Sequence, residues 1–489
     1  MVFSDLFFLY IFIPAVMLCY ALARCADKAY ADNSRHGRFA MPENICPFSN
    51  AVLIVFSLIF YAWGEPVYIL LMLASVLMNY VVGICIGGGE KRSKAALVVG
   101  VILNIAVIGV FKYADFLVGT LNFFGLPLNK PGIALPIGIS FYTFQSISYL
   151  ADVYRGETQP QKNFASLLLY ISMFPQLIAG PIVRYSAISA EINRRRISFD
   201  DLAEGSFRFL IGLGKKVILA NELSEISSEF LDGNLASLTT GGAWLGIIAY
   251  TFQIYFDFSG YSDMAIGMGR CLGFNFEENF NFPYISGTIT EFWRRWHISL
   301  GSFFRDYVYI PLGGNRRHQM LNILVVWFLT GLWHGASWNF VLWGLYFGVI
   351  ITLEKYTILK ARDKIPSFIL HIYSLFLIIF GWVIFYFDDM SRLGEFIKVL
   401  FGFGSAGGWD LVTQNELFGN IWLIAAAIIC SLPISRLIRN AYDNSSRMEG
   451  AGAEAALTVL KTVSAVAILI VSTLLLIGST TNPFLYLRF

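Results

Sequence analysis

The sequence predicts an all-α, polytopic membrane protein, and three observations support this fold class. Of the 489 residues, 56% are hydrophobic and only 14% are charged, and the mean hydropathy is +0.63. Such a chain has too few polar side chains to cover the surface of a water-soluble globule. The apolar residues also lie in runs of about 20, the length that a helix needs to cross a bilayer. The polar stretches between these runs are too short to fold as independent domains.

The apolar runs follow one another along the whole chain, so we expect a single integral membrane domain over residues 1–489. They cover residues 6–23, 49–64, 66–86, 95–111, 134–152, 164–183, 205–222, 241–258, 321–353, 366–387, 418–438 and 455–478. The run 321–353 is long enough for two helices, and Gly335 marks the expected break. In total we expect about 11 to 13 transmembrane or re-entrant helices.

The connecting segments indicate the orientation of the first helices. Four Arg or Lys residues follow the first run, between residues 24 and 38. Positive charge concentrates on the cytoplasmic side of membrane helices, which places the N-terminus outside the cytoplasm. No Lys or Arg precedes the first run, as a signal peptide would require, so we expect an uncleaved helix.

The run 164–183 does not fit a simple alternation of sides. It should end outside the cell, yet Arg184 and residues 194–196, all arginines, follow it. Pro175, Gly180 and Pro181 interrupt the run, and such breakers permit a split or re-entrant helix where protein buries the freed backbone groups. The sequence therefore predicts a broken helix here.

Residues 290–343 hold three of the five histidines and form the candidate site. Residues 290–310 fit a basic amphipathic helix at the membrane surface, with His297 at the border between its polar and apolar faces. His334 lies in a far more apolar stretch, so we expect the two histidines at different depths. An ionisable group in such a stretch is a functional hypothesis by default. The alternative is a buried histidine bonded to a backbone carbonyl, and the local residues do not choose between them.

Several patterns that carry other chemistries are missing from the sequence. It has no GxSxG nucleophile motif, no HExxH zinc motif, no glycine-rich dinucleotide turn, and no Cys or His spacing typical of a metal site. The net charge of +2 is spread along the chain, which argues against nucleic-acid binding. We expect no metal, no tightly bound cofactor and no nucleic-acid partner.

Five sequence runs, in order, resemble the bacterial branch of the membrane-bound O-acyltransferase (MBOAT) family, especially the membrane subunits of alginate O-acetylation. They are PIGISFYTFQSISYLADVYRG (136–156), FPQLIAGPIVRY (174–185), FDFSGYSDMAIGMGRCLGFNFEENFNFPY (256–284), FWRRWHISLGSFFRDYVYIPLGGNR (292–316) and LTGLWHGASWNFVLWG (329–344). The motif-bearing core then spans about 136–348, followed by further membrane helices at about 366–478. The resemblance implies a central cavity or tunnel that crosses the membrane.

The resemblance also implies roles for the two histidines. A hydroxyl attacks a thioester only after a base removes its proton, and neutral imidazole is suited to this task. His334 matches the family's catalytic histidine. His297 matches the second polar position of the family's active site, where it would orient the thioester or stabilise the oxyanion. Trp296, Trp333, Trp338 and Asn339 are candidates to line the pocket, although an ordinary core role fits the tryptophans equally well.

A set of basic residues is a candidate mouth for the donor. Arg294, Arg295 and Arg305 would bind the phosphates of coenzyme A or of a carrier-bound thioester. Lys215, Lys216, Arg316 and Arg317 would join them if they lie near. Attraction to anionic lipid headgroups explains the same charges.

The function implied is transfer of an acetyl group from a cytoplasmic thioester, acetyl-CoA or a carrier, to an exported polysaccharide at the bacterial inner membrane. The group would pass directly or through an extracytoplasmic esterase-like partner. D-alanyl transfer to teichoic acid and peptidoglycan O-acetylation are alternatives within the family. A transporter or channel is the alternative of another class, although the sequence has no inverted repeat of the kind found in transporters.

Overall fold

The computed structural model describes residues 2–35, 46–88, 92–178, 180–434 and 451–478, together with Leu485. The expected span 418–438 and the first basic segment, residues 24–38, extend in part beyond these described residues. Within these ranges the regular structure is helical and no strand is present. The predicted all-α class is confirmed.

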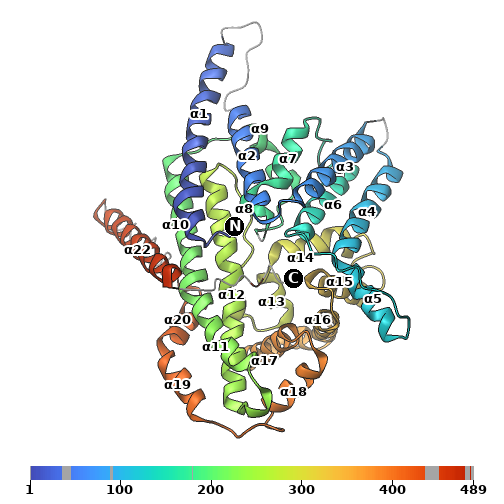
Figure 1. Cartoon of the computed structure of the whole chain (residues 1–489), viewed down its shortest axis with the longest axis vertical. Helices are drawn as coiled ribbons and strands as arrows, with labels where there is room; N and C mark the ends of the chain where they lie inside the picture. The colour runs from blue at the N-terminus through green and yellow to red at the C-terminus, as the bar shows by residue number, and fades with distance from the viewer. Residues whose placement is uncertain are drawn as a thin grey trace. The chain divides into compact units, whose positions relative to one another are not determined.

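The chain divides into two compact units, and the first comprises Met1–Phe209 and Ser262–Glu277. Its helices begin at apolar runs and end near polar or glycine-containing turns. In order they are η1 (Phe8–Phe12), α1 (Ile13–Arg35), α2 (Pro47–Gly64), α3 (Ile69–Gly87), α4 (Lys94–Ile108), η2 (Gly109–Tyr113), α5 (Ala114–Phe123), α6 (Ile139–Arg155), α7 (Phe164–Ser172), α8 (Phe174–Leu177), α9 (Tyr185–Asn193) and most of α10 (Phe199–Gly214) (Figure 1).

The second unit comprises Leu210–Tyr261 and Glu278–Phe489 and holds both candidate histidines. The long helix α12 (Thr240–Cys271) contributes to both units. The other helices of the second unit are η3 (Lys215–Asn221), α11 (Glu222–Leu231), η4 (Leu235–Ser237), η5 (Pro283–Ile285), α13 (Ile289–Arg295), α14 (Ile298–Phe304), η6 (Arg305–Tyr309), α15 (Gln319–His334), α16 (Trp338–Tyr356), η7 (Ile358–Lys360), η8 (Arg362–Lys364), α17 (Ser367–Tyr386), α18 (Met390–Leu400), α19 (Leu411–Gly419), α20 (Ile421–Ser431) and α22 (Ala451–Gly478).

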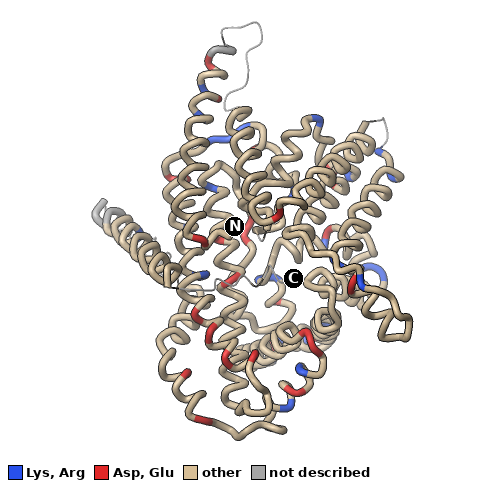
Figure 2. Tube along the Cα trace, in the orientation of Figure 1, with Lys and Arg blue, Asp and Glu red and all other residues tan. Residues whose placement is uncertain are grey.

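Seven helices in the described ranges are long and apolar enough to cross a membrane, or eight if the bent pair α19 and α20 forms one span. They are Phe8–Asp32, Pro47–Gly64, Ile69–Gly87, Lys94–Phe123, Trp338–Lys360, Ser367–Tyr386 and Thr458–Gly478. Figure 2 shows long stretches of such helices without a charged residue. The remaining predicted runs, among them those in α6, α10 and α12, also form helices, but these helices fall outside this set.

The predicted break in the run 164–183 is confirmed. Helix α7 ends at Ser172, and α8 begins two residues later with Pro175 in its first turn. The amide N–H of Phe174, at the start of α8, donates a 3.1 Å hydrogen bond to the Ser57 hydroxyl, so a side chain of α2 satisfies a backbone group that the break frees. Residue 179 lies outside the described residues.

The hairpin of α15 and α16 is the part of the second unit that carries His334. The predicted break near Gly335 is confirmed, because α15 ends at His334 and α16 begins at Trp338. A Cβ atom at Gly331 would clash with the Phe340 carbonyl oxygen, and one at Gly344 with the Trp327 carbonyl oxygen. Glycine at these two positions therefore permits the two helix backbones to approach closely.

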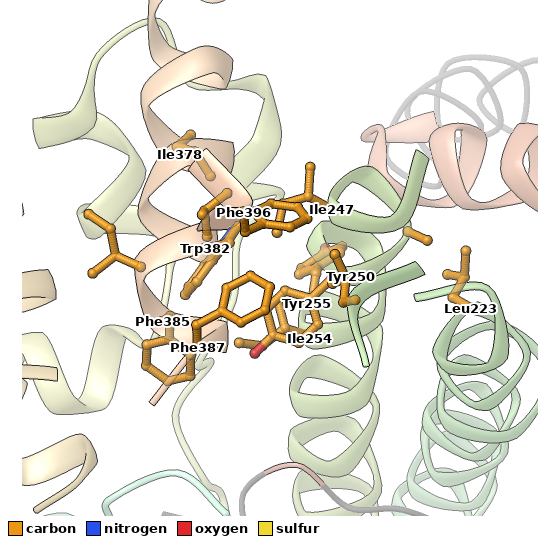
Figure 3. Packing of buried hydrophobic residues seen from close by; sticks show 14 of the residues in the cluster. Leu223, Ile247, Tyr250, Ile254, Tyr255, Ile378, Trp382, Phe385, Phe387 and Phe396 are labelled. Carbon is orange, nitrogen blue, oxygen red and sulfur yellow. The ribbon is translucent and has the colours of Figure 1, made fainter. Parts of the chain in front are cut away.

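The core of the second unit is rich in aromatic rings. Buried side chains of α12 meet those of α17 and α18 in one cluster, of which Tyr250, Tyr255, Trp382, Phe385 and Phe396 are labelled members (Figure 3). Phe385 links this core to the site, since its ring also contacts His334.

Candidate active site

His297 lies at a break between two short helices, and this corrects the predicted single helix over 290–310. Helix α13 ends at Arg295 and α14 begins at Ile298, while His297 has a φ of +46°, in the left-handed region. The ring is 1% exposed and is thus buried, whereas the amphipathic pattern placed it at a border between faces.

Neighbouring backbone explains this break. The N–H of Asn281 donates to the carbonyl of Arg295 at 2.9 Å, and the N–H of Ile298 donates to the carbonyl of Asn279 at 3.0 Å. The segment 279–281 thus binds backbone groups on both sides of His297 that a continuous helix would use internally. The turn therefore depends on a partner that the local amphipathic pattern does not contain.

The side chain of Asn279 also holds the imidazole of His297. Its Oδ1 atom lies 3.1 Å from His297 Nδ1 and accepts hydrogen bonds from Ser299 N at 3.2 Å and Ser299 Oγ at 2.9 Å. Asn279 is fully buried. The rings of Phe258 and Trp333 pack against the imidazole at centroid distances of 4.6 and 5.6 Å. Hydrogen bonds and ring contacts together fix the orientation of His297.

A cavity of about 190 Å³ adjoins His297. Three predicted site residues, Trp296, His297 and Arg305, contribute to its walls. The complete lining is Trp293, Trp296, His297, Leu300, Gly301, Phe304, Arg305, Tyr309, Ile323, Val326, Trp327, Thr330 and Ile351. Most of these side chains are apolar, and the charged Arg305 and the phenol of Tyr309 add polar groups, so the cavity suits a ligand with an apolar body and a polar end.

His334 lies at the last residue of α15 and is 3% exposed. Its ring packs against Trp333, Trp343 and Phe385 at centroid distances of 4.9, 4.9 and 5.3 Å. A Cβ atom at Gly335 would overlap the Phe340 ring, so the turn after His334 requires glycine. The carbonyl groups at a helix C-terminus stabilise positive charge, which suits a histidine that gains a proton.

Trp333 joins the two histidines, since its ring contacts both imidazoles. It is 5% exposed. Both histidines are buried against one indole, so the structure brings together two residues that the sequence pattern assigned to different depths.

The predicted arginines occupy different environments. Arg305 is exposed and pairs with the neighbouring Asp306 through two hydrogen bonds of 2.6 and 3.0 Å. Arg295 pairs with Glu291 and donates to the Asn281 carbonyl at 3.1 Å. Arg294 is exposed. Of the three, Arg305 alone contributes to the described cavity.

Lys216, which the sequence offered as a further member of the basic mouth if it lay near, is buried instead. Its ammonium forms a 2.8 Å ion pair with Asp257, and both side chains are at most 3% exposed. Asp263, in the same sequence motif as Asp257, pairs with Arg208 at 2.8 Å. Pairing of these charges explains their presence in apolar helices without a role in donor binding.

Trp338 and Asn339 begin α16 and lie apart from the described cavity lining. The Trp338 indole is 53% exposed, whereas Asn339 is fully buried. The Asn339 side chain donates to the carbonyl groups of Ile384 and Phe385 at 3.4 and 3.3 Å. Asn339 therefore holds the end of α17 and supports the Phe385 ring that contacts His334.

Glu354 is a buried residue of the site region that the sequence interpretation missed. Its carboxylate accepts hydrogen bonds from Ile289 N, Thr290 N and Thr290 Oγ1 at 2.6, 2.7 and 2.6 Å. A carboxylate at a helix N-terminus satisfies free N–H groups and interacts favourably with the helix dipole. Glu354 of α16 thus anchors α13, the helix that leads to His297. The sequence signal that could have identified Glu354 is its position as a lone acidic residue near the end of an apolar run.

Comparison with known proteins identifies the family. The model of the membrane-bound O-acyltransferase family matches residues 160–393. The probable alginate O-acetylase AlgI of Pseudomonas aeruginosa is 40% identical over 427 residues, which cover 85% of this chain and 77% of that protein. The protein of the same name from Pseudomonas putida is 37% identical over 511 residues and covers both chains completely.

A relative with another named acceptor also matches the whole chain. The peptidoglycan O-acetyltransferase of Helicobacter pylori is 31% identical over 539 residues, which cover 100% of this chain and 98% of that protein. The matching family model and the multi-pass, all-α architecture both indicate a membrane protein. The chain therefore belongs to the membrane-bound O-acyltransferase family and is an O-acyltransferase.

Proposed function

We propose that this enzyme moves an acetyl group from a cytoplasmic thioester, acetyl-CoA or a carrier, to a hydroxyl of an exported polysaccharide, and that His334 is the general base. The observation that carries the proposal is the position of His334. It is a buried imidazole at a helix C-terminus, within contact of aromatic rings, in a member of an acyltransferase family. Alginate O-acetylases among its relatives favour acetyl as the acyl group.

The chemistry assigned to His334 is that of a neutral imidazole. It takes the proton of the acceptor hydroxyl as the hydroxyl oxygen attacks the thioester carbonyl. The tetrahedral intermediate collapses, the carbon–sulfur bond breaks, and the thiolate leaves with the proton that the imidazolium returns. The products are an O-acetyl ester and a free thiol. The carbonyl groups at the end of α15 favour the transient imidazolium.

The cavity beside His297 supports a donor site. Its largely apolar walls suit the thioester end of a long, thin arm, and Arg305 suits a phosphate or another anionic group. Arg294 and Arg295 belong to the same segment and remain in the proposal as donor contacts at the surface.

A second candidate acceptor is peptidoglycan. The match to the Helicobacter pylori peptidoglycan O-acetyltransferase covers the whole chain. This match favours peptidoglycan over any acceptor other than alginate. Transfer of D-alanine and solute transport without acyl transfer are the remaining rivals.

We propose that the enzyme lies in the bacterial inner membrane with its N-terminus outside the cytoplasm and works with an extracytoplasmic esterase-like partner.

The test is turnover of acetyl-CoA labelled in its acetyl group by the purified protein in liposomes, with alginate, peptidoglycan or teichoic acid fragments as acceptors. Labelled ester on alginate supports the main proposal, and labelled ester on peptidoglycan fragments supports the second candidate. A parallel assay with a D-alanyl thioester tests the D-alanine alternative. Absence of thioester cleavage with every donor and acceptor, with and without membrane extract to supply a partner, would overturn the proposal.

A further inference from the structure

The hydrogen bonds around Asn279 determine which nitrogen of His297 carries a proton. Asn279 Oδ1 accepts a hydrogen bond from Ser299 N at 3.2 Å and lies 3.1 Å from His297 Nδ1. A backbone N–H only donates, so the Asn279 atom that it meets must be the amide oxygen, not the amide nitrogen. Because that oxygen only accepts, His297 must donate to it from Nδ1. In a neutral imidazole the other nitrogen, Nε2, then carries the lone pair.

We propose that Asn279 is a positioning residue that fixes His297 as the Nδ1–H tautomer, so that Nε2 accepts a hydrogen bond from a second hydroxyl of the acceptor, next to the attacking one. The assignment of the hydroxyl rests on the proposed function, whereas the tautomer rests on geometry alone. In this arrangement Nε2 holds the second hydroxyl and so orients the acceptor, and the proton of the attacking hydroxyl passes to His334. Nε2 of His297 then accepts a hydrogen bond from the substrate. It does not donate one to the oxyanion of the intermediate, which is the role that the family resemblance also implied.

The surroundings of His297 favour the neutral ring. Burial lowers its pKa to about 3, and the residue lies outside the candidate membrane spans. Phe258 of α12 and Trp333 of α15 face the imidazole and carry no charge. The charged and titratable groups that share its cavity are Arg305 and Tyr309.

The backbone and the side chain of Asn279 make separate hydrogen bonds at the His297 turn. The Asn279 carbonyl accepts from Ile298 N at 3.0 Å, while its side chain binds His297 and Ser299. Loss of the side-chain acceptor alone would leave the backbone bond in place. A substitution at Asn279 can therefore alter the His297 tautomer without removing the turn.

The first experiment measures the tautomer directly and needs no activity. Protein labelled with 15N-histidine contains five histidines, and comparison with the His297→Asn variant assigns the His297 signals. We expect a protonated Nδ1 and an unprotonated Nε2 near neutral pH in the wild-type protein. A protonated Nε2 would overturn the proposal even if the acyltransferase function holds.

The second experiment uses a variant that keeps the hydrogen bond but adds charge. In Asn279→Asp the carboxylate still accepts from Ser299 N and His297 Nδ1, and it raises the pKa of His297 because it stabilises the imidazolium. An imidazolium has no lone pair, so the acceptor role is lost as the pH falls. We expect the ratio of acetyl transfer at about pH 6 to that at about pH 8 to fall about threefold or more relative to wild type.

The opposite result identifies the rival role. If His297 donates to the oxyanion, protonation strengthens it, and Asn279→Asp raises relative activity at the acidic pH. A raised or unchanged ratio would overturn the acceptor role. Asn234→Asp is the matched control, since Asn234 is exposed in the same unit and the charge change is identical. If Asn279→Asp does not fold, the spectrum of the wild-type protein still decides the tautomer.

Discussion

His297 and His334 both lie at helix breaks and both contact Trp333, but different groups hold the two turns. The His297 turn is built from hydrogen bonds, with Asn279 bound to the imidazole and Glu354 bound to the preceding helix. The His334 turn is built from close packing, with Gly335 against Phe340 and the imidazole among aromatic rings. Hydrogen bonds therefore orient the imidazole at the first turn, and ring contacts orient it at the second.

The difference suits the two tasks that we propose for these histidines within one acyl transfer. Directional hydrogen bonds give His297 a single tautomer, which suits orientation of a substrate group. Ring packing holds the plane of the His334 imidazole, and this suits the general base that we propose. Variants that disturb one turn and spare the other test this division.

Removal of the His334 imidazole has the largest expected effect. We expect His334→Ala to lower acetyl transfer from labelled acetyl-CoA about 100- to 10,000-fold, the usual contribution of a positioned acid or base. The control is His318→Asn, because His318 is exposed and has a φ of +47° that asparagine tolerates. Turnover by His334→Ala at the wild-type rate would show that His334 is not the general base.

A methyl group at Gly331 disturbs the packed turn without changing its chemistry. In Gly331→Ala the added Cβ meets the Phe340 carbonyl oxygen, and forced packing of this kind costs about 1–3 kcal/mol. We expect a lower thermal unfolding midpoint in detergent. Gly394→Ala is the matched control, because its Cβ finds no atom within 4 Å and alanine favours a helix. Equal midpoints for the two variants would contradict close packing of α15 on α16.

Neutralisation of Glu354 loosens the other turn. Glu354→Gln keeps the size of the side chain but weakens three charge-assisted hydrogen bonds to the start of α13, at a cost of about 1.5 kcal/mol. We expect a lower unfolding midpoint and a change in the His297 15N signals with little change in those of His334. Glu395→Gln, at an exposed position in the same unit, is the control. Equal changes at both histidines would show that the two turns act as one element.

The shared indole gives the smallest expected effect. Trp333→Phe retains an aromatic ring but shortens it, and loss of part of an aromatic contact is worth about 1 kcal/mol, or less than tenfold in rate. We expect a similar small loss in acetyl transfer and a shift of both sets of histidine signals. A shift at one histidine alone would mean that Trp333 supports only that turn.

The sequence by itself determined the all-α membrane class, the broken helix after Ser172 and the turn near Gly335, and it singled out the two candidate histidines. These features depend on local properties. Long apolar runs require helices in a bilayer, proline and glycine interrupt them, and a histidine in an apolar stretch is unusual enough to be noticed. In the sequence, Gly331 and Gly335 are four residues apart, as are Gly344 and Gly348, and this spacing of small residues permits close helix packing.

The tertiary structure alone decided the break at His297, the burial of Lys216 with Asp257, and the roles of Asn279 and Glu354. No proline or glycine adjoins His297, and the amphipathic pattern continues through it. The turn exists because Asn279 and Asn281 bind the backbone on either side, and α13 is anchored by a carboxylate 65 positions away. A hydrogen bond depends on where a distant partner lies in space, and a periodic pattern within one segment carries no information about that partner.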